Sequence, residues 1–419
     1  MRLDINPLGH LLAATALFCL ASPAVAATPV DDWSGDGGVP AFYQWDQPVP
    51  QRPGIMLRTE TAPVEVSIPA AGRAERILYS STDWRDATQA TTVSGIVFFP
   101  KGNAPKGGWP VIAWAHGTTG IADVCAPSVM QRSPRDAQYF GYWLDHGYAI
   151  VASDYVGLGT PGVHPYLQYR AEGISVLDGI RAALARYPEL NRDKIVTIGQ
   201  SQGSEGAIAA AYLAPSYAPE LHIRGTVATG IVAHTENVGK SRQLPLPQIY
   251  MDPADTGNSA YEILWFLGTA RSADPVNVKP ADYLSSGGWA MLARSQKTCM
   301  TGLRAFAREQ NLPFSQFYKV SIDTLDRQTA IRSAFPDVHV VTPVFIGTGL
   351  NDKDANPAKQ FNFISAMCTA GTRVEWHYYP GQDHGSAVPA SLADAPAFVD
   401  AAMNGRAIAG NCKALVPPG

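Results

Sequence analysis

Charged residues are few in this sequence, and neither sign of charge dominates. Only 16% of the 419 residues are Asp, Glu, Lys or Arg, and the formal net charge at pH 7 is −4. Proteins that bind nucleic acid usually carry a basic face or stripe, which this sequence lacks. Since 46% of the residues are hydrophobic, the chain can bury a large core. The composition therefore predicts a globular protein and no nucleic-acid partner.

The sequence also lacks an apolar run long enough to cross a bilayer. The apolar run at residues 11–20 is shorter than the ~20 residues that a transmembrane helix needs. It follows Arg2 and precedes Ala-Val-Ala at 24–26, the layout of a secretory signal with its cleavage site. No small residue directly precedes Cys19, which disfavours a lipoprotein anchor. We predict that residues 1–26 are a cleaved signal peptide, and that the mature protein is secreted or periplasmic without a stable membrane anchor.

Cysteine is scarce, with five residues in all, and the predicted signal peptide contains one of them. The other four are Cys125, Cys299, Cys368 and Cys412. An even number in an exported protein predicts two disulfides, and four cysteines allow three connectivities. No C-x-x-C or Cys/His spacing typical of a metal site is present, so no metal is expected. Free buried thiols remain the alternative.

A strand, a sharp turn and a helix are predicted around Ser201. Ile195, Val196 and Ile198 form a β-branched run that suits a buried parallel strand. The sequence GQSQG at 199–203 follows and matches the G-x-S-x-G nucleophile elbow, in which a Cβ at either glycine would collide with its neighbours. The alanine-rich segment after it is predicted to be a helix that ends at Pro215. The alternative is an ordinary glycine-rich turn with an incidental serine.

Apolar runs and helical patterns alternate along much of the remaining chain. Further strands are predicted at 93–99, 111–115, 148–153, 225–232, 340–346 and 374–379. Helices are predicted at 131–146, at 174–184 and at 392–403. This alternation indicates the α/β class with a mostly parallel sheet.

Two segments depart from this alternation and define the predicted domain organisation. The first, from Ala27 to about Arg58, is rich in Pro, Gly, Asp and Trp and is predicted to be an irregular arm. The second, 233–336, has mainly helical signals. We therefore predict a core of two parts, 27–232 and 337–419, with residues 233–336 inserted as a helical cap.

A serine nucleophile needs a histidine to accept its proton and a carboxylate to orient that histidine. The chain order Ser, Asp, His is typical of α/β-hydrolases, and Ser201, Asp352 and His384 satisfy it. His384 is preferred to His377, because it lies in a loop beyond the last predicted strand and His377 lies inside that strand. Asp352 stands in a G-x-x-D-x-x-A loop, and Asp354 remains the alternative acid.

Two other motifs do not support a bound ion or nucleotide. The D-x-D-x-N pattern at 352–356 resembles the start of a calcium-binding loop, but Pro357 and Phe363 replace the required glycine and glutamate. The G-x-G-x-x-G match at 157–162 is interrupted by Pro161 and does not open a helix. Neither calcium nor a dinucleotide is expected.

The loop after the predicted strand at 111–115 is a candidate for part of an oxyanion hole. In an α/β-hydrolase this loop supplies one backbone N–H, and the residue after the nucleophile supplies the other. We assign these two donors to Thr118 and Gln202. The alternative is a plain turn with a structural histidine, His116.

Four stretches together resemble the secretory lipase family. They are AWAHGTTG at 113–120, CAPS at 125–128, DYVGLG at 154–159 with HPYL at 164–167, and GQSQG at 199–203. The resemblance covers nearly the whole mature chain. It implies an α/β-hydrolase fold with a large helical cap, carboxylester hydrolysis without a cofactor, and disulfides pairing Cys125 with Cys299 and Cys368 with Cys412. Ser204 departs from the glycine that is usual at its position in this family.

The sequence therefore predicts a serine carboxylesterase or lipase that acts through an acyl-enzyme on a small-molecule, lipid or polymeric ester. An acyltransferase or peptidase with the same triad stays open, because the pocket chooses the acceptor. A non-catalytic binding module is disfavoured, because all three triad candidates are present. Six large side chains of the predicted cap are expected to line an acyl or aromatic-ester pocket or, alternatively, to form the core of the cap itself. They are Tyr261, Leu264, Trp265, Trp289, Met291 and Phe314.

Overall fold

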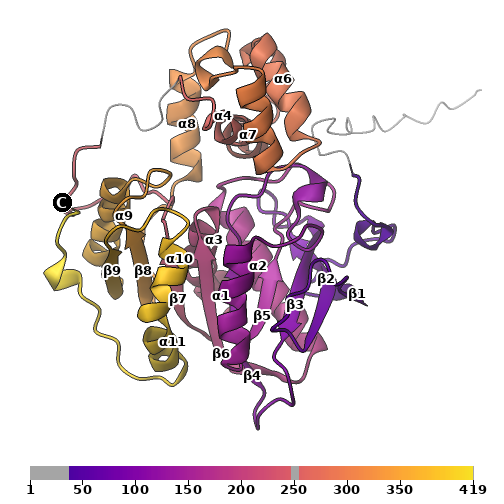
Figure 1. Cartoon of the computed structure of the whole chain (residues 1–419), viewed down its shortest axis with the longest axis vertical. Coiled ribbons are helices and arrows are strands. Elements are labelled where there is room, and N and C mark those ends of the chain that lie inside the picture. The colour runs from indigo at the N-terminus through magenta and orange to yellow at the C-terminus, as the bar shows by residue number, and fades with distance from the viewer. Residues whose placement is uncertain (1–36, 247–253, 419) are drawn as a thin grey trace, which may run out of the picture. The chain divides into compact units, whose positions relative to one another are not determined.

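A sheet of nine strands organises the computed structural model, which describes residues 37–246 and 254–418 (Figure 1). The strands are β1 Met56–Thr61, β2 Arg73–Thr82, β3 Ala90–Phe99, β4 Trp109–Ala115, β5 Ala149–Ser153, β6 Leu190–Gln200, β7 Ile223–Thr229, β8 Val344–Gly349 and β9 Val374–Tyr379. Their order in the sheet is β1-β2-β3-β5-β4-β6-β7-β8-β9. The pairs from β1 to β5 are antiparallel, and all pairs from β5 to β9 are parallel. The predicted signal peptide, residues 1–26, lies outside the described residues.

Helices cover both faces of the sheet (Figure 1). One face packs against α1 (Pro134–Asp145) and α11 (Ala395–Met403), and the other against α2 (Tyr169–Arg186), α3 (Gln202–Tyr217) and α9 (Pro357–Thr369). Strand β4 shows how the sequence builds these layers. Its residues at 111, 113 and 115 join the α2/α3 side, whereas those at 112 and 114 join the α1/α11 side. Because successive strand side chains point to opposite faces, an apolar run places core on both sides.

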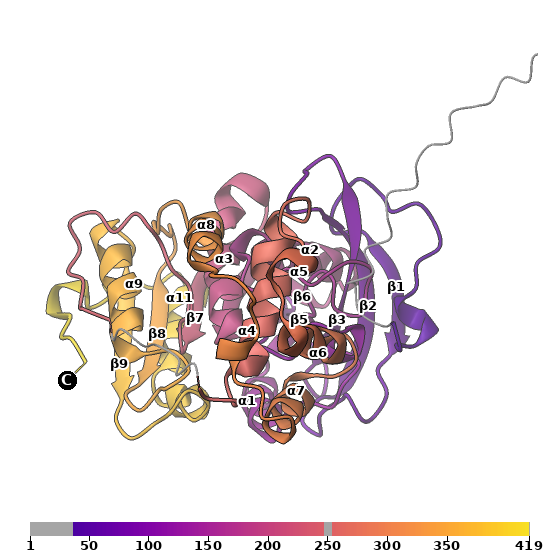
Figure 2. The ribbon, with the colours of Figure 1, turned by 90° about the horizontal axis from the view of Figure 1, so that it is seen from above.

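Between β7 and β8 lies a helical insertion, residues 230–343. Its helices are α4 Ser259–Leu264, a π-helical turn Trp265–Arg271, α5 Pro280–Tyr283, α6 Ser286–Ser295, α7 Met300–Glu309 and α8 Asp323–Ser333. The insertion has its own hydrophobic core, which includes Leu264, Met291 and Phe317. Figure 2, seen from above, shows α4 and α6 in front of the middle of the molecule and α7 in front of α1. The insertion contacts the core closely, because a Cβ on Gly268 would lie 2.5 Å from the Cβ of Tyr166.

The N-terminal part of the sheet differs from the prediction. The arm expected to be irregular as far as about Arg58 already contains the start of β1, which begins at Met56 and pairs with β2. The sequence analysis predicted neither strand. Polar and charged residues are frequent in both strands (MLRTET and RAERILYSST), so their apolar patterns were weaker than those of the other strands.

Several element boundaries also differ from the predicted ones, and three of them illustrate why. Helix α3 continues past Pro215 to Tyr217. A proline in the last turn removes only one backbone hydrogen bond, so the helix can extend over the next two residues. The strand predicted at 340–346 begins at Val344. The residue before it, Pro343, has no backbone N–H to donate to a neighbouring strand. The final helix begins at Ala395 rather than at 392.

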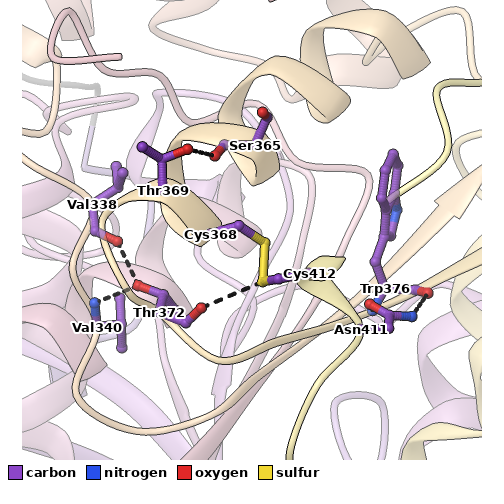
Figure 3. The surroundings of a disulfide bond; sticks show 9 residues. All are labelled: Val338, Val340, Ser365, Cys368, Thr369, Thr372, Trp376, Asn411 and Cys412. Atoms are coloured by element: carbon purple, nitrogen blue, oxygen red, sulfur yellow. Dashed lines mark hydrogen bonds between the residues drawn. A yellow bond between two sulfur atoms is a disulfide. The ribbon is translucent and has the colours of Figure 1, made fainter. Parts of the chain in front are cut away.

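A disulfide fastens the C-terminal tail to the core (Figure 3). Cys368 at the end of α9 is bonded to Cys412 in the tail, with Cα atoms 5.6 Å apart. The neighbouring Asn411 donates through Nδ2 to the carbonyl of Trp376 (2.7 Å) and accepts from its N–H through Oδ1 (2.9 Å). The tail is therefore held by one covalent link to α9 and by two hydrogen bonds between the Asn411 side chain and the backbone of β9.

Candidate active site

The turn between β6 and α3 holds Ser201 in a strained conformation. Its φ of 57° and ψ of −126° are unusual for a residue with a side chain. A Cβ on Gly199 would lie 1.8 Å from the carbonyl oxygen of Gly203, and one on Gly203 would lie 1.9 Å from the carbonyl oxygen of Ala115. Only glycine fits at these two positions. The Ser201 N–H donates to the carbonyl of Thr229 (3.0 Å), which ties the turn to β7.

Asp352 and His384 form a buried hydrogen-bonded pair. His384 Nδ1 lies 2.8 Å from Asp352 Oδ2, and the two side chains are 11% and 0% exposed. The other oxygen of Asp352 accepts from the N–H groups of Ala355 (2.7 Å) and Asp354 (3.0 Å). Gln360 Nε2 donates to Oδ2 (3.2 Å). Because Oδ2 is an acceptor, Nδ1 of His384 carries a proton and Nε2 presents a lone pair.

His384 Nε2 has no hydrogen-bond partner in the part of the chain that the structure describes, and His384 lines the same cavity as Ser201. The two alternatives from the sequence lie elsewhere. His377 contacts Glu375 (3.1 Å) on β9 and stacks on Phe345. Asp354 is exposed at the cavity, and the carboxylate on His384 is that of Asp352.

Thr118 and Gln202, the assigned oxyanion-hole residues, come from two segments of the chain. Thr118 is in the loop after β4 and lines the cavity that contains Ser201 and His384. Gln202 is the first residue of α3, so its N–H has no partner within the helix. His116 is held by backbone carbonyl groups on both ring nitrogens and stacks on Tyr155, as a structural histidine would.

A buried polar network, which the sequence analysis missed, holds the side chain of Gln202. Its Nε2 donates to Glu172 Oε1 (2.9 Å) and to His164 Nε2 (2.8 Å). His164 Nδ1 lies 3.0 Å from the carbonyl oxygen of Val156, so Nδ1 carries the proton and Nε2 accepts. Burial lowers the pKa of His164 to about 3, and the ring stays neutral. The network fixes the side chain of Gln202, the residue that follows Ser201.

Two buried glutamates lie within this network. Burial raises the pKa of Glu205, on the first turn of α3, to about 8. Burial and the nearby charge of Glu205 raise the pKa of Glu172 well above its usual value. Glu172 Oε2 and Glu205 Oε1 have no hydrogen-bond partner among the described residues. Neither glutamate belongs to a motif, so the only sequence signal was a charge within an apolar helix face.

Two cavities meet at Ser201 and share Tyr261 and Asp354. The first, which we name the aromatic cavity, has a volume of about 410 Å³. Its lining residues are Tyr166, Leu167, Ser201, Val232, Asn258, Tyr261, Glu262, Trp265, Phe314, Ile322, Asp326, Lys353, Asp354 and Lys359. The second, which we name the arginine cavity, has a volume of about 500 Å³ and is lined by Arg132, Arg135 and Arg304 together with Ser201 and His384.

The six large side chains expected at a substrate pocket divide into three groups. Tyr261, Trp265 and Phe314 line the aromatic cavity. Leu264 and Met291 are fully buried in the core of the insertion. The sixth, Trp289, is 36% exposed. Both interpretations of this set therefore apply, each to different residues.

The structure also bears on metals and membranes within residues 37–246 and 254–418. These residues contain no group of three or more His, Cys, Asp or Glu side chains arranged to hold a metal ion. None of the helices they form combines the length and the apolarity that a membrane span requires.

Solved structures share this fold. The structure superposes on that of Candida antarctica lipase A with a TM-score of 0.68 at 19% sequence identity, covering 90% of this chain and 88% of that one. It superposes on the rice cell wall degrading esterase LipA from Xanthomonas oryzae with a TM-score of 0.64 at 18% identity, covering 84% and 97%. Together with the mostly parallel sheet, these similarities show that the chain has the α/β-hydrolase fold.

Sequence comparisons find partial similarity to lipases. Residues 136–243 match the secretory lipase family, and the chain is 26% identical over 247 residues to Lipase A of Moesziomyces aphidis, covering 54% of this chain and 50% of that protein. The chain spans about half the length of the curated relatives it matches. The resemblance to secretory lipases that the motifs predicted is confirmed.

Proposed function

We propose that the protein is a serine hydrolase that cleaves carboxylic esters through an acyl-enzyme. The observation that carries this proposal is the His384–Asp352 pair: His384 lines the cavity that contains the strained Ser201, and its Nε2 has no hydrogen-bond partner among the described residues. A strained serine with a glycine on each side is the arrangement of a nucleophile elbow. The resemblance to lipases supports the same chemistry.

The chemistry follows from the position of each group. Ser201 Oγ attacks the ester carbonyl carbon while His384 Nε2 takes its proton, and Asp352 stabilises the imidazolium. The N–H groups of Thr118 and Gln202 donate to the oxyanion of the tetrahedral intermediate. His384 then returns the proton to the leaving alcohol, which leaves an acyl group on Ser201. Water attacks that acyl group by the same route and releases the acid.

The helical insertion supplies specificity in this proposal. It acts as the cap, residues 233–336, on a core of 27–232 and 337–419, and its aromatic side chains line the aromatic cavity beside Ser201. Residues 1–26 direct export to the periplasm or the medium. The disulfides Cys125–Cys299 and Cys368–Cys412 support an oxidising compartment.

Covalent labelling tests the nucleophile. Wild type should react with a fluorophosphonate and hydrolyse p-nitrophenyl esters, and Ser201→Ala should lose both activities while its unfolding curve changes little. Labelling that persists in Ser201→Ala would assign the nucleophile to another residue.

Two matched asparagine variants test the acid. Asp352→Asn should lower kcat by on the order of 10⁴, because His384 then adopts the wrong tautomer. Asp354→Asn, two residues away and exposed, should have a much smaller effect. The reverse ranking would assign the role to Asp354.

A further inference from the structure

Several buried hydrogen-bond donors that line the arginine cavity have no acceptor among the described residues. Arg132 Nε, Arg132 Nη2, Arg304 Nε and Thr119 Oγ1 are buried without a hydrogen-bond partner in residues 37–246 and 254–418, and all three residues line this cavity. Buried N–H groups are nearly always satisfied in native proteins, so a local group of unsatisfied donors needs an explanation. An acceptor that belongs to a ligand would supply the missing partners.

The cavity also has an excess of positive charge. Three guanidinium groups line it, and the carboxylates in its lining are those of Asp136 and Asp354. Asp136 pairs with Arg135 at 2.7 Å. Burial lowers the pKa of Arg132 to about 10, which still leaves its guanidinium charged at neutral pH. Arg132 and Arg304 therefore present their charge to whatever occupies the cavity.

Both of these arginines are held in place before any ligand arrives. The Arg132 guanidinium lies over the rings of Phe98 (5.1 Å to the centroid) and Phe140 (4.6 Å). Arg304 Nη2 donates to the hydroxyl of Tyr261 (2.7 Å), and its guanidinium lies 4.8 Å from the centroid of that ring. Groups fixed in this way lose less conformational freedom when they bind.

The buried carboxylate of Asp154 does not replace the missing acceptor. It acts electrostatically on Arg132, but its own oxygens are occupied. Oδ1 accepts from the N–H of Ser128 (2.9 Å), and Oδ2 accepts from the hydroxyl of Ser94 (2.8 Å) and from that of Ser128. Among the described residues, Arg132 Nε and Nη2 have no partner, while both oxygens of Asp154 accept hydrogen bonds.

We propose that the arginine cavity binds a carboxylate carried by one half of the ester substrate, while the aromatic cavity binds the other, uncharged half. The proposal rests on the proposed function, because Ser201 lies where the two cavities meet. Guanidinium groups bind carboxylates through paired, charge-assisted hydrogen bonds, which matches the fixed donors seen here. The substrate class is then a monoester that carries an anionic group on its acid or its alcohol side.

Binding without turnover gives the first test. Benzoate and its neutral analogue benzamide are titrated into wild type and followed by ligand-observed NMR. Benzoate should bind at least about tenfold more tightly, as charge-assisted hydrogen bonds require. Arg304→Gln should reduce this ratio severalfold, and Arg132→Met provides a second variant whose folding is checked by its melting temperature. Arg85→Gln, which removes one charge from a half-exposed site near Asp83, should leave the ratio unchanged.

Turnover of two matched ester pairs then identifies the charged half. The alcohol-side pair is 4-acetoxybenzoate and 4-acetoxybenzamide, and the acid-side pair is monophenyl succinate and phenyl succinamate. The carboxylate member of one pair should have the higher kcat/KM, and Arg304→Gln should reduce that preference.

The two proposals fail in different ways. Equal binding of benzoate and benzamide, or a binding preference that survives both arginine variants, overturns the carboxylate site even if every ester is hydrolysed. Absence of hydrolysis for all four esters, with arginine-dependent benzoate binding, supports the site and refutes the ester hydrolase.

Discussion

Replacing Glu205 with glutamine should make the stability of the protein less sensitive to pH. In the folded protein Glu205 is 1% exposed, and burial raises the pKa of its carboxyl from 4.5 to about 8. The folded state therefore holds a proton that the unfolded chain releases above pH 4.5. The contribution of this proton to the free energy of unfolding is fully present below pH 4.5 and is lost as the pH rises towards 8.

The size of this effect follows from the pKa change. Each unit by which the pKa differs between the folded and the unfolded state corresponds to about 1.4 kcal/mol of stability. Between pH 5 and pH 8, the free energy of unfolding of wild type should therefore fall by about 3 to 4 kcal/mol more than that of Glu205→Gln. The charged groups that act on Glu205 are Glu172, which shares its buried site, and Lys359, which lowers the pKa of Glu205.

Urea unfolding at pH 5, 6.5 and 8 with the disulfides intact measures this difference. Glutamine keeps the shape of the side chain, so comparing the two proteins across pH separates the charge effect from a packing defect. Glu65→Gln, at an exposed site before β2, provides the control and should follow wild type. A constant stability difference between Glu205→Gln and wild type at all three pH values would show that Glu205 is ionised throughout, and the reasoning would be wrong.

Three further results are expected. Gly203→Ala should abolish activity and soluble folding, because its Cβ would overlap the carbonyl of Ala115. Gly141→Ala should be tolerated, because the nearest atom to its Cβ would lie 3.7 Å away. Circular dichroism and ester hydrolysis compare the two variants. Removing the Cys368–Cys412 disulfide by paired serine substitutions should lower the free energy of unfolding by about 4 kcal/mol, because the loop it closes spans 44 residues; an unchanged urea midpoint would contradict this. Trp265→Ala should shift the preferred acyl length of p-nitrophenyl esters, whereas Trp289→Ala, outside the cavity lining, should not.

The sequence predicted best what depends on local chemistry. The elbow around Ser201 needs two glycines and a serine within five residues, and the loops with Asp352 and His384 each follow a strongly apolar strand. Chain order then gave the candidate triad, since the carboxyl ends of parallel strands meet at one edge of the sheet. Helix α2 and strands β3 to β7 followed from the same periodicity.

What the sequence could not give depends on tertiary packing. The cavity lining includes Trp265 and excludes Trp289, although both are aromatic residues on predicted cap helices, because the face that each helix turns to the core decides the outcome. Glu172 and Glu205 come together from different helices, so no linear motif marks them. Proline propensity suggested a helix end at Pro215, yet two more residues remain helical.

The disulfide between Cys125 and Cys299 restricts how the helical insertion can move relative to the core. It joins the segment after the Thr118 loop to the start of α7, and the Met300 N–H also donates to the carbonyl of Thr119 (2.9 Å). The helical insertion is thus attached to the core at a third place, besides its two ends at β7 and β8. A rigid displacement of the whole insertion away from the Thr118 loop would have to break this link. If the protein hydrolyses bulky esters as proposed, the insertion would therefore admit them by rearranging internally while the start of α7 stays in place, and reduction of this one bond would remove that restriction.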